Sequence, residues 1–237
     1  MKVVVTGASG GIGAALVAKQ VNLGNDVIAV SSKTSTNGIA TPDDGAQWLL
    51  NCPPAEYGMT LRPLLQQSLP NTVFHCCGVL HQNGLMPEKA LRQFSPAQLL
   101  DNINANCIAA VNLLQVLEPH FNRQSQCKII VLSAKVGSIE DNYLGGWHSY
   151  RMSKAALNMA IKTVSIEWRR RFPGVTVVAV HPGTTDSTLS QPFQKNVPAS
   201  QLASAATTAD RLSALAGQLS AEDSGALLHW DGSKIPF

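Results

Sequence analysis

Short runs of apolar, often β-branched residues alternate along the chain with longer stretches of mixed apolar and polar residues. The runs have the length and composition of buried strands, and the mixed stretches those of helices. Alternating strands and helices favour a parallel sheet that is covered on both faces. We therefore expect an α/β fold in three α/β/α layers with about seven strands, over residues 2–6, 26–30, 47–51, 72–77, 127–134, 175–180 and 226–230.

Proline and glycine mark where several predicted helices begin and end. Ser95-Pro96 opens one helix with a capping serine and a proline at its first position, whereas Pro173-Gly174 ends another. The predicted helices cover residues 14–21, 58–69, 95–117, 147–171 and 201–218, and residues 34–46 and 79–94 are expected to be loops.

No shift in composition marks a boundary inside the chain, which predicts a single domain over residues 1–237. Residues 184–200 are the least regular late segment, and they follow the strand at 175–180. Ligands bind beyond the carboxyl ends of the strands in such sheets. We therefore expect a substrate loop at 184–200, acting as a lid; a long surface connection is the alternative.

A glycine-rich turn lies between the first strand and the first helix. Its sequence is Thr6-Gly7-Ala8-Ser9-Gly10-Gly11-Ile12-Gly13. Glycines allow a tight turn and a close approach of the backbone, and the helix N-terminus offers free N–H groups to a pyrophosphate. This context predicts a Rossmann-type doubly wound sheet that binds a dinucleotide, with an ordinary turn as the alternative. The candidate contacts are Gly7, Ser9, Gly10, Gly11, Ile12 and Gly13.

The ends of the next two strands bear on the choice of dinucleotide. The second strand ends in Ser31-Ser32-Lys33, without the carboxylate that would bind the adenine ribose hydroxyls of NAD. Hydroxyls and an ammonium suit a 2′-phosphate, so NADP(H) is favoured over NAD(H), unless Lys33 is only a solvated loop residue. Asn51 and Cys52, at the end of the third strand, are candidates for contact with the adenine.

Tyr150 and Lys154 are four residues apart in a predicted helix, which places a phenol and an ammonium on one face. A neighbouring cation favours phenolate, so we expect the Tyr150 pKa to fall towards that of a general acid/base. A solvated lysine beside a half-buried tyrosine has the same spacing. The pair gains meaning only from a partner site elsewhere in the chain.

Composition narrows the function further. Of 237 residues, 45% are hydrophobic and 14% charged, and the formal charge of +3 is too small for a nucleic-acid footprint. The five cysteines include no CxxC motif and do not have the spacing of metal ligands. We interpret Cys76 and Cys77 as buried thiols rather than as a redox pair. An odd cysteine count without a secretory segment predicts a cytoplasmic protein, and no apolar run is long enough to span a membrane.

The combined motifs resemble the short-chain dehydrogenase/reductase family over essentially the whole chain. Thr6-Gly7-xxx-Gly11-x-Gly13 resembles its TGxxxGxG cofactor motif, and Tyr150-xxx-Lys154 its YxxxK motif. The segments at 133–138 and 149–158 and the C-terminal Trp230-Asp231-Gly232-Ser233 are similar to the C-factor/sniffer carbonyl reductase branch.

The resemblance implies roles for further residues. Tyr150, Lys154, Asn106 and a serine would form the catalytic set, with Asn106 holding a water that links Lys154 to solvent. Further cofactor contacts would be Cys77, Gly78, Tyr150, Lys154, Pro182, Gly183, Thr184, Thr185 and Ser187. The family's NNAG reads His75-Cys76-Cys77-Gly78 here, without either asparagine.

The serine is the sharpest departure from the family. Alignment of Val136-Gly137 places Ala134 at the serine position, with Ser133 one residue before it and Ser138 four after it. Ser133 is the predicted catalytic serine, with Ser138 or no serine as alternatives. A single residue step reverses the direction of a strand side chain, so Ser133 needs a twist or bulge at the strand end.

Three functions follow from these residues. The first is an NADP-dependent oxidoreductase that transfers hydride between nicotinamide and a carbonyl or alcohol, with Tyr150 as general acid/base. The second is an NADP(H)-binding regulatory or signalling protein with little turnover, which the displaced serine supports. A sugar-nucleotide epimerase ranks last because the chain is short. The resemblance also implies a homodimer or homotetramer through the helices at 95–117 and 147–171, a small-molecule substrate, and no metal, nucleic-acid or membrane partner.

Overall fold

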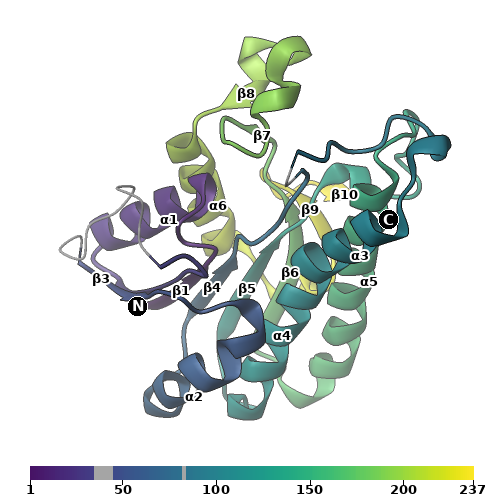
Figure 1. Cartoon of the computed structure of the whole chain (residues 1–237). Coiled ribbons are helices and arrows are strands. Elements are labelled where there is room, and N and C mark those ends of the chain that lie inside the picture. Colours follow the sequence, from purple (N-terminus) through teal and green to yellow (C-terminus); the bar gives the residue numbers. More distant parts are fainter. Residues whose placement is uncertain (35–44, 82–83) are drawn as a thin grey trace.

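The computed structural model of the chain describes residues 1–34, 45–81 and 84–237. Within them, eight strands form one sheet in the order β10-β9-β6-β5-β4-β1-β2-β3 (Figure 1). Only the pair β9–β10 is antiparallel among these described strands. The strands are β1 (Lys2–Thr6), β2 (Asp26–Val30), β3 (Ala46–Leu49), β4 (Thr72–His75), β5 (Cys127–Leu132), β6 (Val175–His181), β9 (Leu227–His229) and β10 (Lys234–Ile235).

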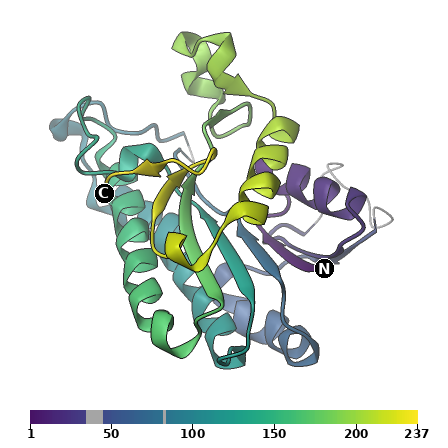
Figure 2. The same cartoon turned by 180° about the vertical axis from the view of Figure 1, so that it is seen from behind.

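Helices cover both faces of the sheet, as Figures 1 and 2 show. One face carries α1 and α6, which pack against each other, and the other carries α2, α4 and α5. The helices are α1 (Gly11–Asn22), α2 (Tyr57–Gln67), α3 (Pro96–Ile103), α4 (Ala109–Leu117), α5 (His148–Arg171) and α6 (Ala205–Gln218). The predicted three-layer Rossmann-type architecture is therefore confirmed.

The apolar strands fill two cores because successive side chains point to opposite faces. In β1, Val4 packs into the core under α2, α4 and α5, whereas Val3 and Val5 pack into the core under α1 and α6. All three valines are at most 1% exposed. Both faces of the strand must therefore be apolar, which explains the unbroken apolar run in the sequence.

The register of the sheet brings the loops after four strands to one edge. Thr6 pairs with His75, and His75 with Val131, so β1, β4 and β5 end at the same level. β6 continues this edge, because Leu132 pairs with Val180. The strand order reverses between β1 and β4, which is where sheets of this kind bind ligands.

The structure corrects several predicted boundaries. The predicted helix at 95–117 is divided, because a π-helical turn at Asn104–Ile108 separates α3 from α4. The segment predicted as irregular contains β7 (Thr184–Thr185), which pairs with β8 (Leu202–Ala203) in a separate two-stranded sheet. β10 was not predicted, since a two-residue strand leaves no periodic pattern. Most of the predicted loop at 34–46, and residues 82–83 of the loop at 79–94, lie outside the described residues.

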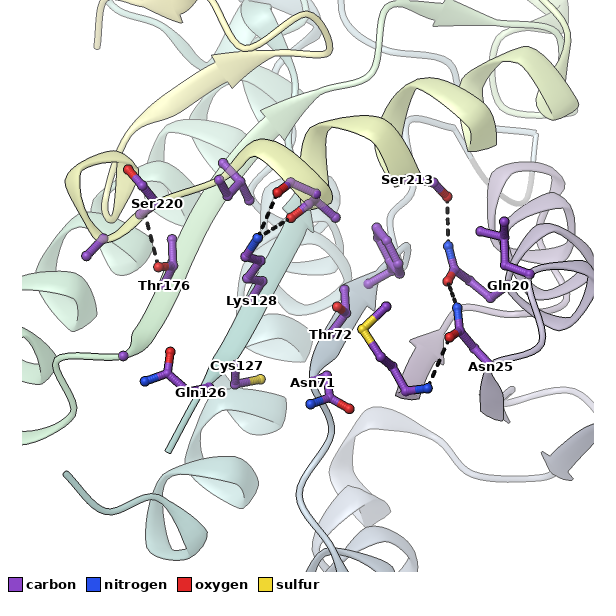
Figure 3. Close-up of a pocket in the computed structure, with 18 of the residues that line it drawn as sticks. Gln20, Asn25, Asn71, Thr72, Gln126, Cys127, Lys128, Thr176, Ser213 and Ser220 are labelled. Carbon is purple, nitrogen blue, oxygen red and sulfur yellow. Dashed lines mark hydrogen bonds between the residues drawn. The ribbon is translucent and has the colours of Figure 1, made fainter. Parts of the chain in front are cut away.

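The opposite, amino-terminal edge of the sheet is held together by polar contacts around a hollow of about 740 Å³ (Figure 3). The Lys128 ammonium donates to the carbonyl oxygens of Ala216 and Gly217 at 2.8 and 3.1 Å, at the end of α6. A cation there stabilises the helix C-terminus. Gln20 donates to Ser213 at 2.7 Å, which ties α1 to α6. These contacts position α6, whose N-terminus follows the predicted substrate loop.

Candidate active site

The glycine turn adopts a conformation that only glycine tolerates. Gly7 has φ +71°, and a Cβ there would lie 2.8 Å from the Cys76 carbonyl carbon. A Cβ at Gly13 would lie 2.2 Å from the Gly7 carbonyl oxygen. The turn is therefore packed tightly against itself and against the loop after β4.

The first turn of α1 leaves donors free for an anion. Gly10, at its N-cap, provides no side-chain cap. Within the described residues, the amides of Gly11, Ile12 and Gly13 have no hydrogen-bond acceptor. Free amides at a helix N-terminus bind phosphate groups, so the turn fits the pyrophosphate of a dinucleotide.

A hollow of about 710 Å³ continues from this turn along the edge of the sheet. Gly7, Ser9 and Gly10 line one side, and Cys77 and Gly78 line another. Its far end holds Ser32, Lys33 and Cys52. These residues, which the sequence assigned to the cofactor, thus line one cavity beside the turn that fits a pyrophosphate.

Two of the predicted cofactor contacts, Ser31 and Asn51, do not line this hollow. The Ser31 hydroxyl donates to Ser9 Oγ at 2.7 Å and accepts from the Lys33 amide at 3.0 Å, so it orders the turn. Asn51 is exposed, has φ +53° and donates its amide to the Lys33 carbonyl oxygen at 2.9 Å. Of this segment's side chains, Lys33 is the cation that lines the hollow.

Tyr150 and Lys154 lie one turn apart in α5, as predicted. Tyr150 is 8% exposed and lines a second cavity, of about 650 Å³. The Lys154 Nζ atom donates to the Leu132 carbonyl oxygen at 3.0 Å and lies 5.9 Å from the centre of the Tyr150 ring. A Cβ at Gly78 would lie 3.4 Å from this Nζ atom. Lys154 therefore lies between the tyrosine and the cofactor hollow.

The electrostatics of the pair differ from the expectation. Burial raises the pKa of Tyr150, and it lowers the pKa of Lys154 to about 8. The predicted fall of the Tyr150 pKa is therefore wrong for this structure, because burial outweighs an ammonium that is bonded to the Leu132 carbonyl. At pH 7 the phenol remains protonated. Lys154 remains mainly charged, because pH 7 lies below its pKa. This is the protonation state of a proton donor with a cation beside it.

Asn106 lies in the π-helical turn and is fully buried. Its side-chain amide donates to the Val79 carbonyl oxygen and to Ser153 Oγ, both at 2.9 Å, and its Oδ1 accepts from the Val79 amide at 2.7 Å. It thus connects the loop after β4 to α5 next to Lys154. A π-helical turn often marks a functional site. The predicted water on Asn106 stays a prediction.

The three residues considered for the serine role have different surroundings. Ser133 lines the second cavity, but its hydroxyl donates to Asn158 Oδ1 at 2.6 Å. Ser138 is buried, and its hydroxyl accepts from the Asp141 amide at 3.0 Å. Ala134 packs with Leu80 and Tyr150 in a small cluster that faces this cavity. The side chain next to Tyr150 is therefore a methyl group.

Ala134→Ser is expected to raise kcat for carbonyl reduction about tenfold, because it adds a hydroxyl beside Tyr150 that can stabilise a developing oxyanion. Ser133→Ala, at the neighbouring position, is expected to lower kcat less than threefold, since the Ser133 hydroxyl is bonded to Asn158. Steady-state kinetics of both variants separate the two positions. A large loss in Ser133→Ala with no gain in Ala134→Ser would assign the role to Ser133.

The predicted substrate loop forms one wall of the second cavity. Thr184, Thr185 and Ser187 line it together with Pro182 and Gly183. Ser187 also approaches the glycine turn, because a Cβ at Gly11 would lie 3.2 Å from its Cβ. The residues after β6 that were predicted to contact the cofactor therefore all line this cavity.

Two aromatic side chains, those of Trp147 and Phe193, complete the cavity. The Trp147 ring lies 4.9 Å from the Phe193 ring and 6.2 Å from the Tyr150 ring. Phe193 belongs to residues 184–200, so this segment contacts the helix that carries Tyr150. His181 also lines the cavity, and burial lowers its pKa to about 4.

Sequence reasoning missed several cavity residues. Tyr57, Pro53 and Cys76 line the cofactor hollow, and Tyr143 and Leu144 lie at the mouth of the second cavity. The Tyr57 hydroxyl lies 3.4 Å from Cys77 Sγ, and burial raises the pKa of both Cys76 and Cys77. Among the described residues, no group of three His, Cys, Asp or Glu side chains could hold a metal ion. Over the same residues, no helix has the length and apolar character needed to cross a bilayer.

Comparison with known proteins places this geometry in a family. The family described as short chain dehydrogenase matches residues 72–198. The chain is 26% identical over 148 residues to C-signal of Myxococcus xanthus, covering 62% of this chain and 84% of that protein. It is 30% identical over 127 residues to 1-hydroxy-2-glutathionyl-2-methyl-3-butene dehydrogenase of Rhodococcus sp. (strain AD45). The latter match covers 52% of this chain and spans only 50% of that relative's length.

Solved structures share the whole fold. Carbonyl reductase Sniffer of D. melanogaster has a TM-score of 0.83 at 19% identity, covering 100% of this chain and 99% of that chain. The NADPH-bound carbonyl reductase from chicken fatty liver has a TM-score of 0.82 at 26% identity, with 100% and 98% covered. The family match spans more than half of the chain and includes Tyr150 and Lys154. The protein is therefore an oxidoreductase of the short-chain dehydrogenase family.

Proposed function

We propose that the protein is an NADP-dependent carbonyl reductase in which Tyr150 is the general acid. The observation that carries the proposal is the position of Tyr150 in the wall of the second cavity, with Lys154 one turn away beside the cofactor hollow. The likeness to an NADPH-bound carbonyl reductase supports the same cofactor and reaction class.

The chain's own residues supply binding, orientation and a proton. When bound, reduced nicotinamide would supply the hydride. Tyr150 would donate its phenolic proton to the oxygen of the carbonyl that is being reduced, and its raised pKa keeps this proton in place until then. Lys154, held by the Leu132 carbonyl, would stabilise the phenolate that remains. Proton and hydride together convert the carbonyl into an alcohol.

The second cavity favours an uncharged, largely apolar substrate. Leu80, Val136, Trp147, Leu189 and Phe193 form much of its wall. The charged side chains in its lining are already engaged. Lys135 pairs with Asp141 at 3.1 Å, and Arg151 donates to three backbone carbonyls, those of Val136, Gly145 and Gly146. A carboxylate or phosphate on the substrate would find no unpaired cation among these described lining residues.

The preference for NADP(H) rests on Lys33. Lys33 lines the far end of the hollow, where we expect the adenine ribose to bind. The segment Ser31-Ser32-Lys33 has no carboxylate that would repel a 2′-phosphate. A charge-assisted hydrogen bond contributes about 1.5–3 kcal/mol.

Lys33→Ala is therefore expected to weaken NADPH binding about tenfold and to leave NADH binding unchanged. Fluorescence titration with each cofactor measures both effects. Lys234→Ala, on β10 at the other edge of the sheet, removes the same charge from an exposed lysine and is the control. Equal losses for NADPH and NADH would show that Lys33 does not read the 2′-phosphate.

One experiment tests the proposed reaction against the regulatory alternative. Ala134 in place of a serine and the similarity to C-signal are compatible with a cofactor-binding protein that has little turnover. NADPH oxidation is measured with neutral aldehydes, ketones and quinones, and with carboxylate-bearing analogues. We expect turnover with the neutral compounds. Tight NADPH binding without turnover of any compound would support the regulatory function instead.

We also propose that the protein assembles as a homodimer, or as a homotetramer that contains this dimer, through α3 and α5. Large apolar side chains on these helices and on the π-helical turn are exposed: Leu100 at 61%, Ile108 at 42%, Met152 at 41%, Met159 at 66% and Ile166 at 57%. A stripe of this kind is typical of a surface that a second copy covers. A monomeric mass in light scattering would contradict the assembly.

A further inference from the structure

Glu88 is a buried carboxylate in the loop before α3. It is 2% exposed, and its carboxylate accepts from the Ser149 amide at 3.2 and 3.3 Å and from the Ser149 hydroxyl. Buried carboxylates are rare unless their oxygens are bonded. These contacts join two segments that are 61 residues apart in the chain.

The helix that Glu88 contacts has no cap of its own. The residue before α5 is Trp147, which has φ +52° and makes no side-chain cap, and the first turn contains no acidic residue. The first amides of a helix lack acceptors within the helix, so its first turn depends on a cap. Glu88 provides this cap from another segment, and its negative charge suits the positive end of the helix.

The capped turn is the one that carries Tyr150. α5 begins at His148, so Ser149 and Tyr150 are its second and third residues. Ser149 is fully buried, and the Glu88 carboxylate accepts from both its amide and its hydroxyl. The backbone just before the helix is held as well, because the Trp147 amide donates to the Glu88 carbonyl oxygen.

The loop around Glu88 is itself anchored. The Gln93 side chain accepts from the Lys89 amide at 2.7 Å and from the Ala90 amide at 3.2 Å. Gln98, at the start of α3, donates to the Met86 carbonyl oxygen at 3.1 Å. The carboxylate therefore has a rigid base from which to hold the first turn of α5.

We propose that Glu88 is a positioning residue that fixes the Tyr150 hydroxyl by capping the first turn of α5. This inference rests on the proposed role of Tyr150 as the proton donor. Loss of the cap would leave Ser149 with unpaired buried groups and would release the turn. Misplacement of a catalytic group lowers the rate of the chemical step more than it changes the binding of the cofactor.

Glu88→Ala is expected to lower kcat about tenfold while the dissociation constant for NADPH stays within twofold. Glu88→Gln keeps an oxygen for the Ser149 amide without the charge, so its kcat should lie between those of Glu88→Ala and the wild type. Hydrogen–deuterium exchange should become faster over residues 147–157 in Glu88→Ala and to a smaller extent in Glu88→Gln.

Asp223→Ala is the matched control. The Asp223 carboxylate also accepts from a serine amide and hydroxyl, those of Ser220 at 2.8 and 3.1 Å. Ser220 lines the hollow at the opposite edge of the sheet. This variant should lose stability without losing kcat. A wild-type kcat in folded Glu88→Ala would overturn the positioning role. If Glu88→Ala does not fold, a wild-type kcat together with wild-type exchange in Glu88→Gln would overturn it. Absence of turnover in the wild type would instead contradict the proposed function, and the exchange measurement would still report on the cap.

Discussion

Tyr150→Phe is expected to lower kcat for carbonyl reduction about 1,000-fold, within the range that removal of a general acid gives. The substitution removes the phenolic proton and leaves the ring, which packs with Leu80 and Ala134. Within the described residues, the Tyr150 hydroxyl makes no hydrogen bond, so the fold loses no buried partner. We therefore expect unchanged thermal unfolding and unchanged NADPH affinity alongside the loss of turnover.

Tyr143→Phe is the control for this substitution. Tyr143 also lines the second cavity, but it is 86% exposed at the mouth. Its kcat should match the wild type. Turnover by Tyr150→Phe at a wild-type rate would show that another group delivers the proton.

Gly13→Ala is expected to weaken NADPH binding on the order of 100-fold. The added Cβ would lie 2.2 Å from the Gly7 carbonyl oxygen and 2.9 Å from its carbon, distances that force the turn apart. Displacement of the turn redirects the amides that would hold the pyrophosphate. Overpacking of this kind also destabilises the fold by about 1–3 kcal/mol.

Gly217→Ala provides the control because Gly217 is also helical, yet a Cβ there would meet no atom within 4 Å. Alanine favours the helix by about 1 kcal/mol over glycine, so Gly217→Ala should bind NADPH normally and unfold at the same or a higher temperature. Calorimetric titration and thermal unfolding of both variants test the contrast. NADPH affinity within twofold of the wild type in Gly13→Ala would contradict the assigned phosphate site.

The sequence predicted those features that local patterns determine. The pattern of short apolar runs located seven of the eight strands described in the main sheet, because a buried parallel strand is apolar on both faces. The glycine turn was recognised because its strand and helix are adjacent in the chain. The spacing of Tyr150 and Lys154 correctly placed them one turn apart, since a helix sets that geometry regardless of its surroundings.

Features that depend on distant segments could not be predicted in this way. The cap from Glu88 joins residues 61 positions apart, and nothing near Ser149 indicates it. The direction of the Tyr150 pKa depends on burial under other elements, which the helix alone does not reveal. The partners of Asn106 in the π-helical turn, Val79 and Ser153, lie in distant segments of the chain. The direction of the Ser133 hydroxyl could not be predicted either, because it depends on a hydrogen bond to Asn158, 25 residues away in the chain.

In the proposed reaction, Tyr150 gives a proton to a carbonyl as hydride arrives from NADPH. The most direct test incubates the wild type and Tyr150→Phe with NADPH deuterated at the transferable position and a neutral aldehyde or ketone, and follows the label by mass spectrometry. We predict that the wild type places one deuterium on the carbinol carbon and that Tyr150→Phe, with NADPH bound, produces almost no labelled alcohol. Unlabelled alcohol from the wild type, or equal labelled product from both proteins, would contradict this reaction.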